Sequence, residues 1–246
     1  MKKLLLSAFV ICLAGTSIAQ ESPLWMRHCA LSPDGTTIAF TYKGDIYTVP
    51  STGGRATQIT TNPAFDTEPV WSPDSKQIAF ASDRMGSLDV FVVSSEGGAP
   101  QRLTTHSGSE KPVAYKDNKH ILFTANIAPS AEDAGFPSGQ FQQVYEVAVT
   151  GGRPAMFSSM PMECISINKE GVMLYQDKKG YEDYWRKHQV SPIARDIWTY
   201  TPGKKPVYQK QTTFGGEDRE PVWSPDGKSF YYLSEEKGSF NIFQRG

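Results

Sequence analysis

Short apolar segments separated by turn residues recur along the chain, with the spacing of β-strands rather than of helices. In one clear example, Val70-Trp71 is followed by a Ser-Pro-Asp-Ser sequence at 72–75 and by an apolar segment that begins at Ile78. Proline presets φ for a turn, and Asp or Ser side chains can hydrogen-bond the turn backbone. Further strands are predicted at Asp89–Val93 and Gln101–Thr104. The stretch therefore predicts four short antiparallel strands.

This unit repeats within the chain. Thr60–Phe91 and Thr212–Phe243 align without a gap, and 15 of their 32 positions are identical. A third copy of the core motif lies at Ala30–Tyr47, and weaker copies lie at Pro112–Phe123 and Cys164–Tyr175. A unit of four strands that returns at spacings of 44 to 54 residues is typical of a propeller blade.

We therefore predict an all-β chain that forms a β-propeller of four-stranded antiparallel blades, with about five blades present. The blades are expected at residues 24–61, 66–105, 110–158, 161–213 and 217–246. The last blade has only three recognisable strands, and an open ring exposes a sheet edge. We expect an incomplete six-bladed ring, truncated at its carboxyl end. The alternatives are a β-sandwich with accidental similarity and a short protein that closes by dimerising.

The amino terminus has the features of a secretory signal peptide, predicted at residues 1–19. Lys2 and Lys3 precede an apolar run at Leu4–Ala14, and small residues at Ser17 and Ala19 suit cleavage before position 20. The domain at 20–246 is then expected to be exported, either periplasmic or secreted. Without the leader, the chain has 23 basic and 26 acidic residues. This mixed balance does not indicate nucleic acid or an anionic membrane surface as a partner.

Chemistry-bearing residues are sparse in the pattern. The histidines have no metal-ligand spacing, and no G-x-S-x-G sequence occurs. We expect no catalytic residue, no cofactor and no metal. Asp34, Asp74 and Asp226 are interpreted as turn stabilisers rather than as a calcium ring, because one carboxylate per blade supplies no cage of oxygens. Trp71 and Trp223 are interpreted as blade-packing residues.

Cys29 and Cys164 are the cysteines of the predicted mature chain, and both precede the first hairpin of their units. Disulfides form in exported proteins, but their Cα atoms must lie within about 7 Å of each other. Blades one and four are too far apart for that. We expect two single, buried thiols.

One cluster could contact a partner. It lies in a long insertion of the fourth blade and contains Tyr181, Tyr184, Trp185, Arg186 and His188. Packing of that loop against its own blade is the alternative, and residues 181–190 could also form a single helical turn.

The repeated sequences Ser32-Pro33-Asp34-Gly35, Ser72-Pro73-Asp74 and Ser224-Pro225-Asp226-Gly227 resemble the WD40-like (PD40) repeats of TolB-type and tricorn-type propellers. The stretches Pro23–Trp25 and Asp177–Trp198 resemble more specifically the amino-terminal propeller of secreted bacterial tricorn-like proteases of the S41 serine peptidase family. This resemblance implies a non-catalytic propeller that gates or recognises peptides for a protease core absent from this chain. The implied partners are peptide or protein substrates and the remaining protease domains. A homo-oligomer of the chain is a separate possibility. The alternative is a stand-alone TolB-like envelope module that binds a protein.

Overall fold

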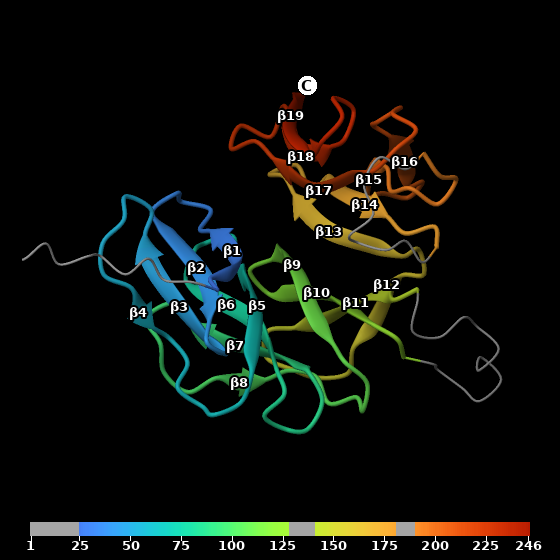
Figure 1. The fold of residues 1–246 in the computed structure, drawn as a ribbon. Coiled ribbons are helices and arrows are strands. Elements are labelled where there is room, and N and C mark those ends of the chain that lie inside the picture. The colour runs from blue at the N-terminus through green and yellow to red at the C-terminus, as the bar shows by residue number, and fades with distance from the viewer. Residues whose placement is uncertain (1–24, 128–140, 181–189) are drawn as a thin grey trace, which may run out of the picture.

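The computed structural model describes residues 25–127, 141–180 and 190–246. Within these ranges every regular element is a strand, and the strands form five antiparallel sheets arranged around a common axis (Figure 1). The predicted all-β propeller is thus confirmed, and each sheet is one blade. No helix long and apolar enough to cross a membrane occurs in these ranges.

Each blade is built from strands that follow one another along the chain. Blade 1 contains β1 (Arg27–Leu31), β2 (Thr37–Tyr42), β3 (Asp45–Pro50) and β4 (Thr57–Gln58). Blade 2 contains β5 (Asp66–Trp71), β6 (Gln77–Ser82), β7 (Asp89–Ser94) and β8 (Gln101–Arg102). Blade 3 contains β9 (Lys111–Asp117), β10 (His120–Ala125), β11 (Gln143–Ala148) and β12 (Ala155–Ser158). Blade 4 contains β13 (Met162–Ile167), β14 (Met173–Asp177), β15 (Ile197–Thr201) and β16 (Val207–Lys210). Blade 5 contains β17 (Asp218–Trp223), β18 (Phe230–Ser234) and β19 (Asn241–Arg245).

The Ser-Pro-Asp sequences form the turns between the first two strands of their blades. The Ser72 hydroxyl donates to Asp74 Oδ1 at 2.7 Å and accepts the backbone N–H of Gln77 at 2.9 Å. The hydrogen bond from Ser72 is the main cause of the lowered pKa of Asp74. Ser32 and Ser224 make the same contacts with Asp34 and Asp226. These aspartates lie on separate turns, so their predicted structural role is confirmed.

Neighbouring blades pack through apolar faces. The wholly buried Ile78 and Phe80 of blade 2 pack against Ala39 and Ile46 of blade 1. Trp71 lies at the same junction, where its indole N–H donates to the backbone carbonyl of Ala30 at 2.9 Å. Trp223 repeats this arrangement at the junction of blades 4 and 5, where it donates to Val172 O at 3.2 Å. Both tryptophans are therefore blade-packing residues, as predicted.

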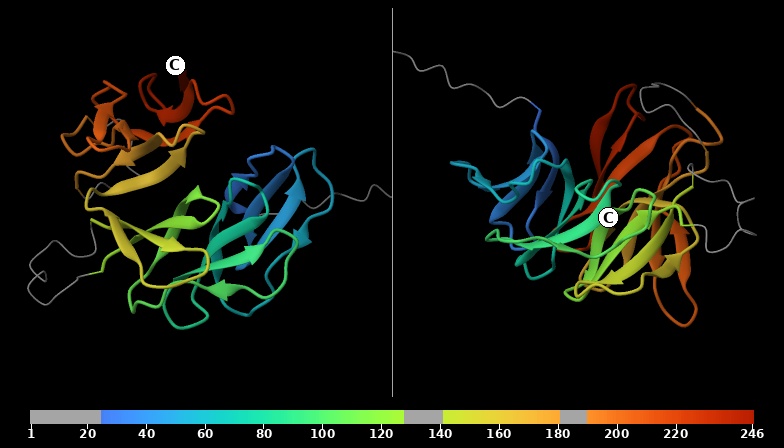
Figure 2. Two further views of the ribbon diagram at one scale, coloured as in Figure 1. Left: turned by 180° about the vertical axis from the view of Figure 1, so that it is seen from behind. Right: turned by 90° about the horizontal axis from the view of Figure 1, so that it is seen from below.

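Blade 5 lies apart from blade 1, so the ring is open between them (Figures 1 and 2). Its free face carries Val222, Tyr231 and Ile242, which are 56%, 40% and 76% exposed. The equivalent residues of blade 2 include Ala79 and Val90, which are fully buried against blade 3. The exposed face thus has the composition of a blade-blade contact.

Candidate functional site

The innermost strands of the blades, which lie around the propeller axis, share an irregularity in their pairing. In β5, two residues, Glu68 and Pro69, oppose the single residue Phe80 of β6, which is a β-bulge. The same shift occurs in β1, β13 and β17, and a related one in β9. A bulge turns side chains away from the alternation of a regular strand. In a regular strand these residues would lie in a blade-blade contact. The bulges of the innermost strands direct them toward the axis instead.

The first bulge residue is strained in four of the five blades. His28, Glu68, Cys164 and Glu220 have φ values of 50°, 56°, 51° and 52°. Such values cost a non-glycine residue of order 1–3 kcal/mol. Within the described ranges, these four are the majority of the seven non-glycine residues with positive φ. Backbone strain therefore concentrates on one ring of positions around the axis.

This ring borders a cavity of about 540 Å³. All five innermost strands contribute to its wall, for example through Cys29, Glu68, Val113, Cys164 and Glu220. Each innermost strand pairs with a neighbour on one side only, so its other edge, with its backbone N–H and C=O groups, faces the cavity. We call this space the axial channel.

Charged groups of both signs lie on the wall of the axial channel. Glu68 accepts from Lys111 Nζ at 2.7 Å. Glu163 accepts from Lys178 Nζ at 3.0 Å and from Gln176 Nε2 at 3.0 Å. Burial would raise the pKa of Glu163, but Lys178 and Gln176 outweigh it and the pKa is lowered. Glu163 is thus held as a carboxylate at the wall.

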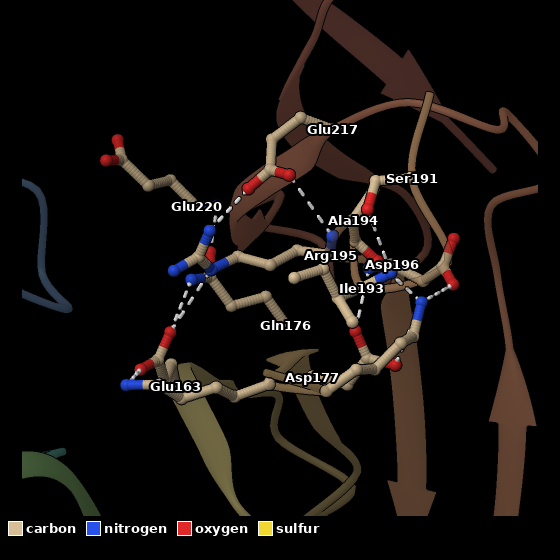
Figure 3. A network of polar contacts seen from close by, with 12 residues as sticks. Glu163, Gln176, Asp177, Ser191, Ile193, Ala194, Arg195, Asp196, Glu217 and Glu220 are labelled. Atoms are coloured by element: carbon tan, nitrogen blue, oxygen red, sulfur yellow. Dashed lines mark hydrogen bonds and ion pairs between the residues drawn. The ribbon is translucent and has the colours of Figure 1, made fainter. Parts of the chain in front are cut away.

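A polar network behind this wall joins blades 4 and 5 (Figure 3). The guanidinium of Arg195 donates to Glu217 Oε1 at 2.5 Å and to Glu163 Oε2 at 3.4 Å. Gln176 Oε1 accepts the backbone N–H of Glu220 at 2.8 Å. The network therefore fixes Glu163 and the strained Glu220, which stand on adjacent blades of the channel wall.

The blade 4 insertion leaves and rejoins the sheet beside the same network. The ammonium of Lys179 donates to the backbone carbonyl of Ala194 at 2.6 Å and also binds Asp196. Asp177 and Asp196 exchange further hydrogen bonds, with Asp196 N–H donating to Asp177 Oδ1 at 2.8 Å. These hydrogen bonds and the ion pair hold the two ends of the insertion together next to Lys178, a residue of the channel wall. Tyr181, Tyr184, Trp185, Arg186 and His188, the predicted contact residues, lie outside the described residues, and so does most of the possible helical turn.

Residues 23–245 match the sequence model of the tricorn protease N-terminal beta propeller domain. The chain belongs to this family. It is 39% identical over 213 residues to tricorn protease homolog 1 of Streptomyces coelicolor, covering 86% of this chain and 19% of that protein. Among solved structures, the tricorn protease is similar with a TM-score of 0.71 and 17% identity, over 91% of this chain and 21% of that one. A putative TolB from Agrobacterium tumefaciens has a TM-score of 0.68 and 16% identity, over 91% of this chain and 76% of that one.

The tricorn-type propeller described here therefore spans about a fifth of the curated tricorn homologue that it matches. The structural similarities, at 16% and 17% identity, establish the shared propeller fold.

The cysteines of this tricorn-type propeller are free, as predicted, but they are exposed rather than buried. Both line the axial channel. The prediction of burial was wrong because Cys164 is the strained bulge residue of β13, and Cys29 follows the strained His28 in β1. Strand alternation cannot reveal such a bulge.

Metal-ligating groups are not gathered anywhere in the described part of the propeller: no cluster of three or more His, Cys, Asp or Glu side chains occurs there. Backbone groups, fixed charges and two thiols line the axial channel.

Proposed function

We propose that this chain is the non-catalytic propeller of an exported tricorn-like peptidase, and that its axial channel recognises extended peptides on their way to a protease core elsewhere in the protein. The observation that carries the proposal is the channel wall, to which all five innermost strands contribute. Family membership and the similarity to tricorn protease homolog 1 support the larger setting. The leader-like sequence at 1–19 supports export.

The geometry favours an extended chain as the bound species. Strand edges bind peptides through main-chain hydrogen bonds, which depend little on the peptide sequence. A folded domain of 100 residues has a radius of gyration of about 13 Å and is far larger than a cavity of about 540 Å³. The wall also carries carboxylates and cations together, so it suits peptides of mixed composition. The channel would therefore select for unfolded substrates by size.

We expect the purified chain to bind fluorescein-labelled unstructured peptides without cleaving them. Cys29→Trp places a large side chain in the axial channel, at an exposed position, and we expect it to weaken peptide binding at least tenfold by fluorescence anisotropy. Val207→Trp is the matched control, because Val207 is 55% exposed on the outermost strand β16. It should leave binding unchanged.

Equal affinities of both variants would place peptide binding outside the axial channel and contradict the proposal. Binding of a folded partner that survives Cys29→Trp, with no affinity for unstructured peptides, would favour the TolB-like alternative instead. Hydrolysis of the peptides by the purified chain would contradict the non-catalytic role.

A further inference from the structure

Carboxylates occur in pairs at three of the four junctions between neighbouring blades, and all of them except the half-buried Asp45 are buried. One member precedes the third strand of a blade or begins it, and the other precedes or begins the innermost strand of the next blade. The pairs are Asp45 with Asp66, Asp89 with Glu110, and Asp196 with Asp218. Their backbones are joined in the same way, since the second acid donates its N–H to the residue before the first acid, at 2.7 to 3.0 Å.

A threonine accompanies each pair. Its hydroxyl accepts the backbone N–H of the residue after the first acid: Thr60 from Ile46 at 3.0 Å, Thr104 from Val90 at 2.9 Å and Thr212 from Ile197 at 3.1 Å. The hydroxyl proton is then left to face a carboxylate. Thr60 donates to Asp45 Oδ1 at 3.2 Å.

The cations at these junctions bind only one member of each pair. Arg84 binds both oxygens of Asp66, at 2.9 and 3.0 Å, and Arg102 binds Asp89 at 2.9 Å. At the third junction, Lys179 and Lys210 bind Asp196. The other members of the three pairs are Asp45, Glu110 and Asp218. Within the described ranges, none of these three forms an ion pair with a lysine or arginine.

Glu110 is the most enclosed of these second carboxylates. It is wholly buried, and so is Asp89, its neighbour across the junction. The groups that face Glu110 are the Thr104 hydroxyl, the backbone and ring of His106 and the carboxylate of Asp89. A buried charge without a partner is costly in free energy. Burial raises the pKa of Glu110, and the carboxylate of Asp89 adds to the rise, whereas the Thr104 hydroxyl and His106 oppose it.

At the other two junctions, too, the carboxylate without a lysine or arginine ion pair has a raised pKa. Partial burial raises the pKa of Asp45, and the Asp66 carboxylate adds to the rise, whereas hydrogen bonds from Thr60 and Gln58 and the charge of Arg84 oppose it. Burial also raises the pKa of Asp218, with the carboxylates of Asp196 and Glu236 adding to the effect. Ser234 and Thr212 oppose that rise by hydrogen bonding.

The junction of blades 3 and 4 is built differently. Gln143 stands where Asp89 stands in blade 2, and Met162 stands where Asp66 begins β5. Both side chains are buried, and neither titrates. This junction is an internal reference for the other three.

We propose that Asp45, Glu110 and Asp218 bind protons in the folded propeller, and that loss of these protons as the pH rises loosens three of the four junctions between blades. Proton linkage gives the direction in which stability changes with pH. Between the unfolded pKa of an acid, about 4, and its higher folded pKa, only the folded state holds the proton, so stability falls as the pH rises. The turn acids Asp34, Asp74 and Asp226 have lowered pKa values. Their contribution is complete above about pH 4 and lost only in stronger acid, so the range from pH 5 to pH 8 separates the junction acids from the turn acids.

The test compares urea unfolding of the chain and of Glu110→Gln from pH 5 to pH 8. The amide of Gln keeps the shape of Glu but cannot carry the charge. We expect the unfolding constant of the unchanged chain to rise relative to that of Glu110→Gln, by up to tenfold per pH unit until the folded pKa is passed. Asp74→Asn is the matched control and should give a ratio that stays flat in this range. A flat ratio for Glu110→Gln would overturn the proposal.

Hydrogen exchange on the unchanged chain provides a second measurement if Glu110→Gln does not fold. The Val90 and Ile197 amides bind the junction threonines, whereas Val144 lies beside the neutral Gln143. After correction for intrinsic rates, protection of Val90 and Ile197 should decrease from pH 5 to pH 8 relative to Val144. Equal changes at all three amides would refute the proposal.

Discussion

Phe80→Ala is expected to lower the free energy of unfolding by about 3–5 kcal/mol. The ring is wholly buried between blades 1 and 2, and it stacks on Phe91 with a centroid distance of 5.9 Å. Removing it leaves a cavity at a junction that can collapse only if a whole blade moves. Domain stabilities are about 5–15 kcal/mol, so this single change would remove a large share of the total. Urea denaturation followed by tryptophan fluorescence measures it.

Phe65→Ala is the matched control for this prediction, because Phe65 is 51% exposed. Its truncation should cost well under half as much. Equal losses for the two variants would contradict the assignment of the blade junction as the source of stability.

Arg195→Ala is expected to destabilise the propeller by about 3–5 kcal/mol. The side chains of Arg195 and Glu217 are each only 10% exposed, so the substitution leaves a carboxylate in a poorly solvated place. Glu163 also loses a partner on the channel wall. The same denaturation experiment on Arg195→Ala, Glu217→Gln and the double variant gives the coupling between the two residues.

The double variant Arg195→Ala, Glu217→Gln should recover part of the loss, since it removes the stranded charge. Lys178→Ala removes the more exposed ion pair with Glu163, whose side chains are 22% and 31% exposed, and should cost about 1 kcal/mol or less. Strictly additive losses for Arg195 and Glu217 would show that the buried ion pair does not act as a unit.

The blades could be predicted from the sequence because their signals are local. The turn at Ser72-Pro73-Asp74, the strands beside it and the repeat at Thr212–Phe243 each lie within a short stretch of chain. Hydroxyl and carboxylate contacts inside those turns then set the register of the hairpins. The number of blades, the three strands of the last blade and the packing role of Trp71 followed from the same pattern.

The axial channel could not be predicted, because a bulge changes the direction of side chains without changing the apolar pattern. Cys164 shows the consequence, since it was predicted to be a buried single thiol and lies exposed at the bulge. The junction carboxylates were missed for another reason: each partner belongs to the next blade. A signal for them does exist, because an acid follows the junction threonine by six residues at Thr60 and Asp66, at Thr104 and Glu110, and at Thr212 and Asp218.

Protection of the channel thiols tests the central claim most directly. Cys29 and Cys164 are free and exposed on the channel wall, so their maleimide alkylation rates can be followed by peptide mapping in a Cys12→Ser chain. Desolvation raises the pKa of the Cys164 thiol to about 12, and Glu220 and Glu163 add to the rise, so Cys164 is expected to react more slowly than Cys29 and is followed over a longer time. If extended peptides occupy the axial channel, a saturating unstructured peptide will slow alkylation of both cysteines, with the concentration dependence seen in anisotropy, and a folded domain will not. Unchanged alkylation of both thiols at peptide saturation would contradict the account.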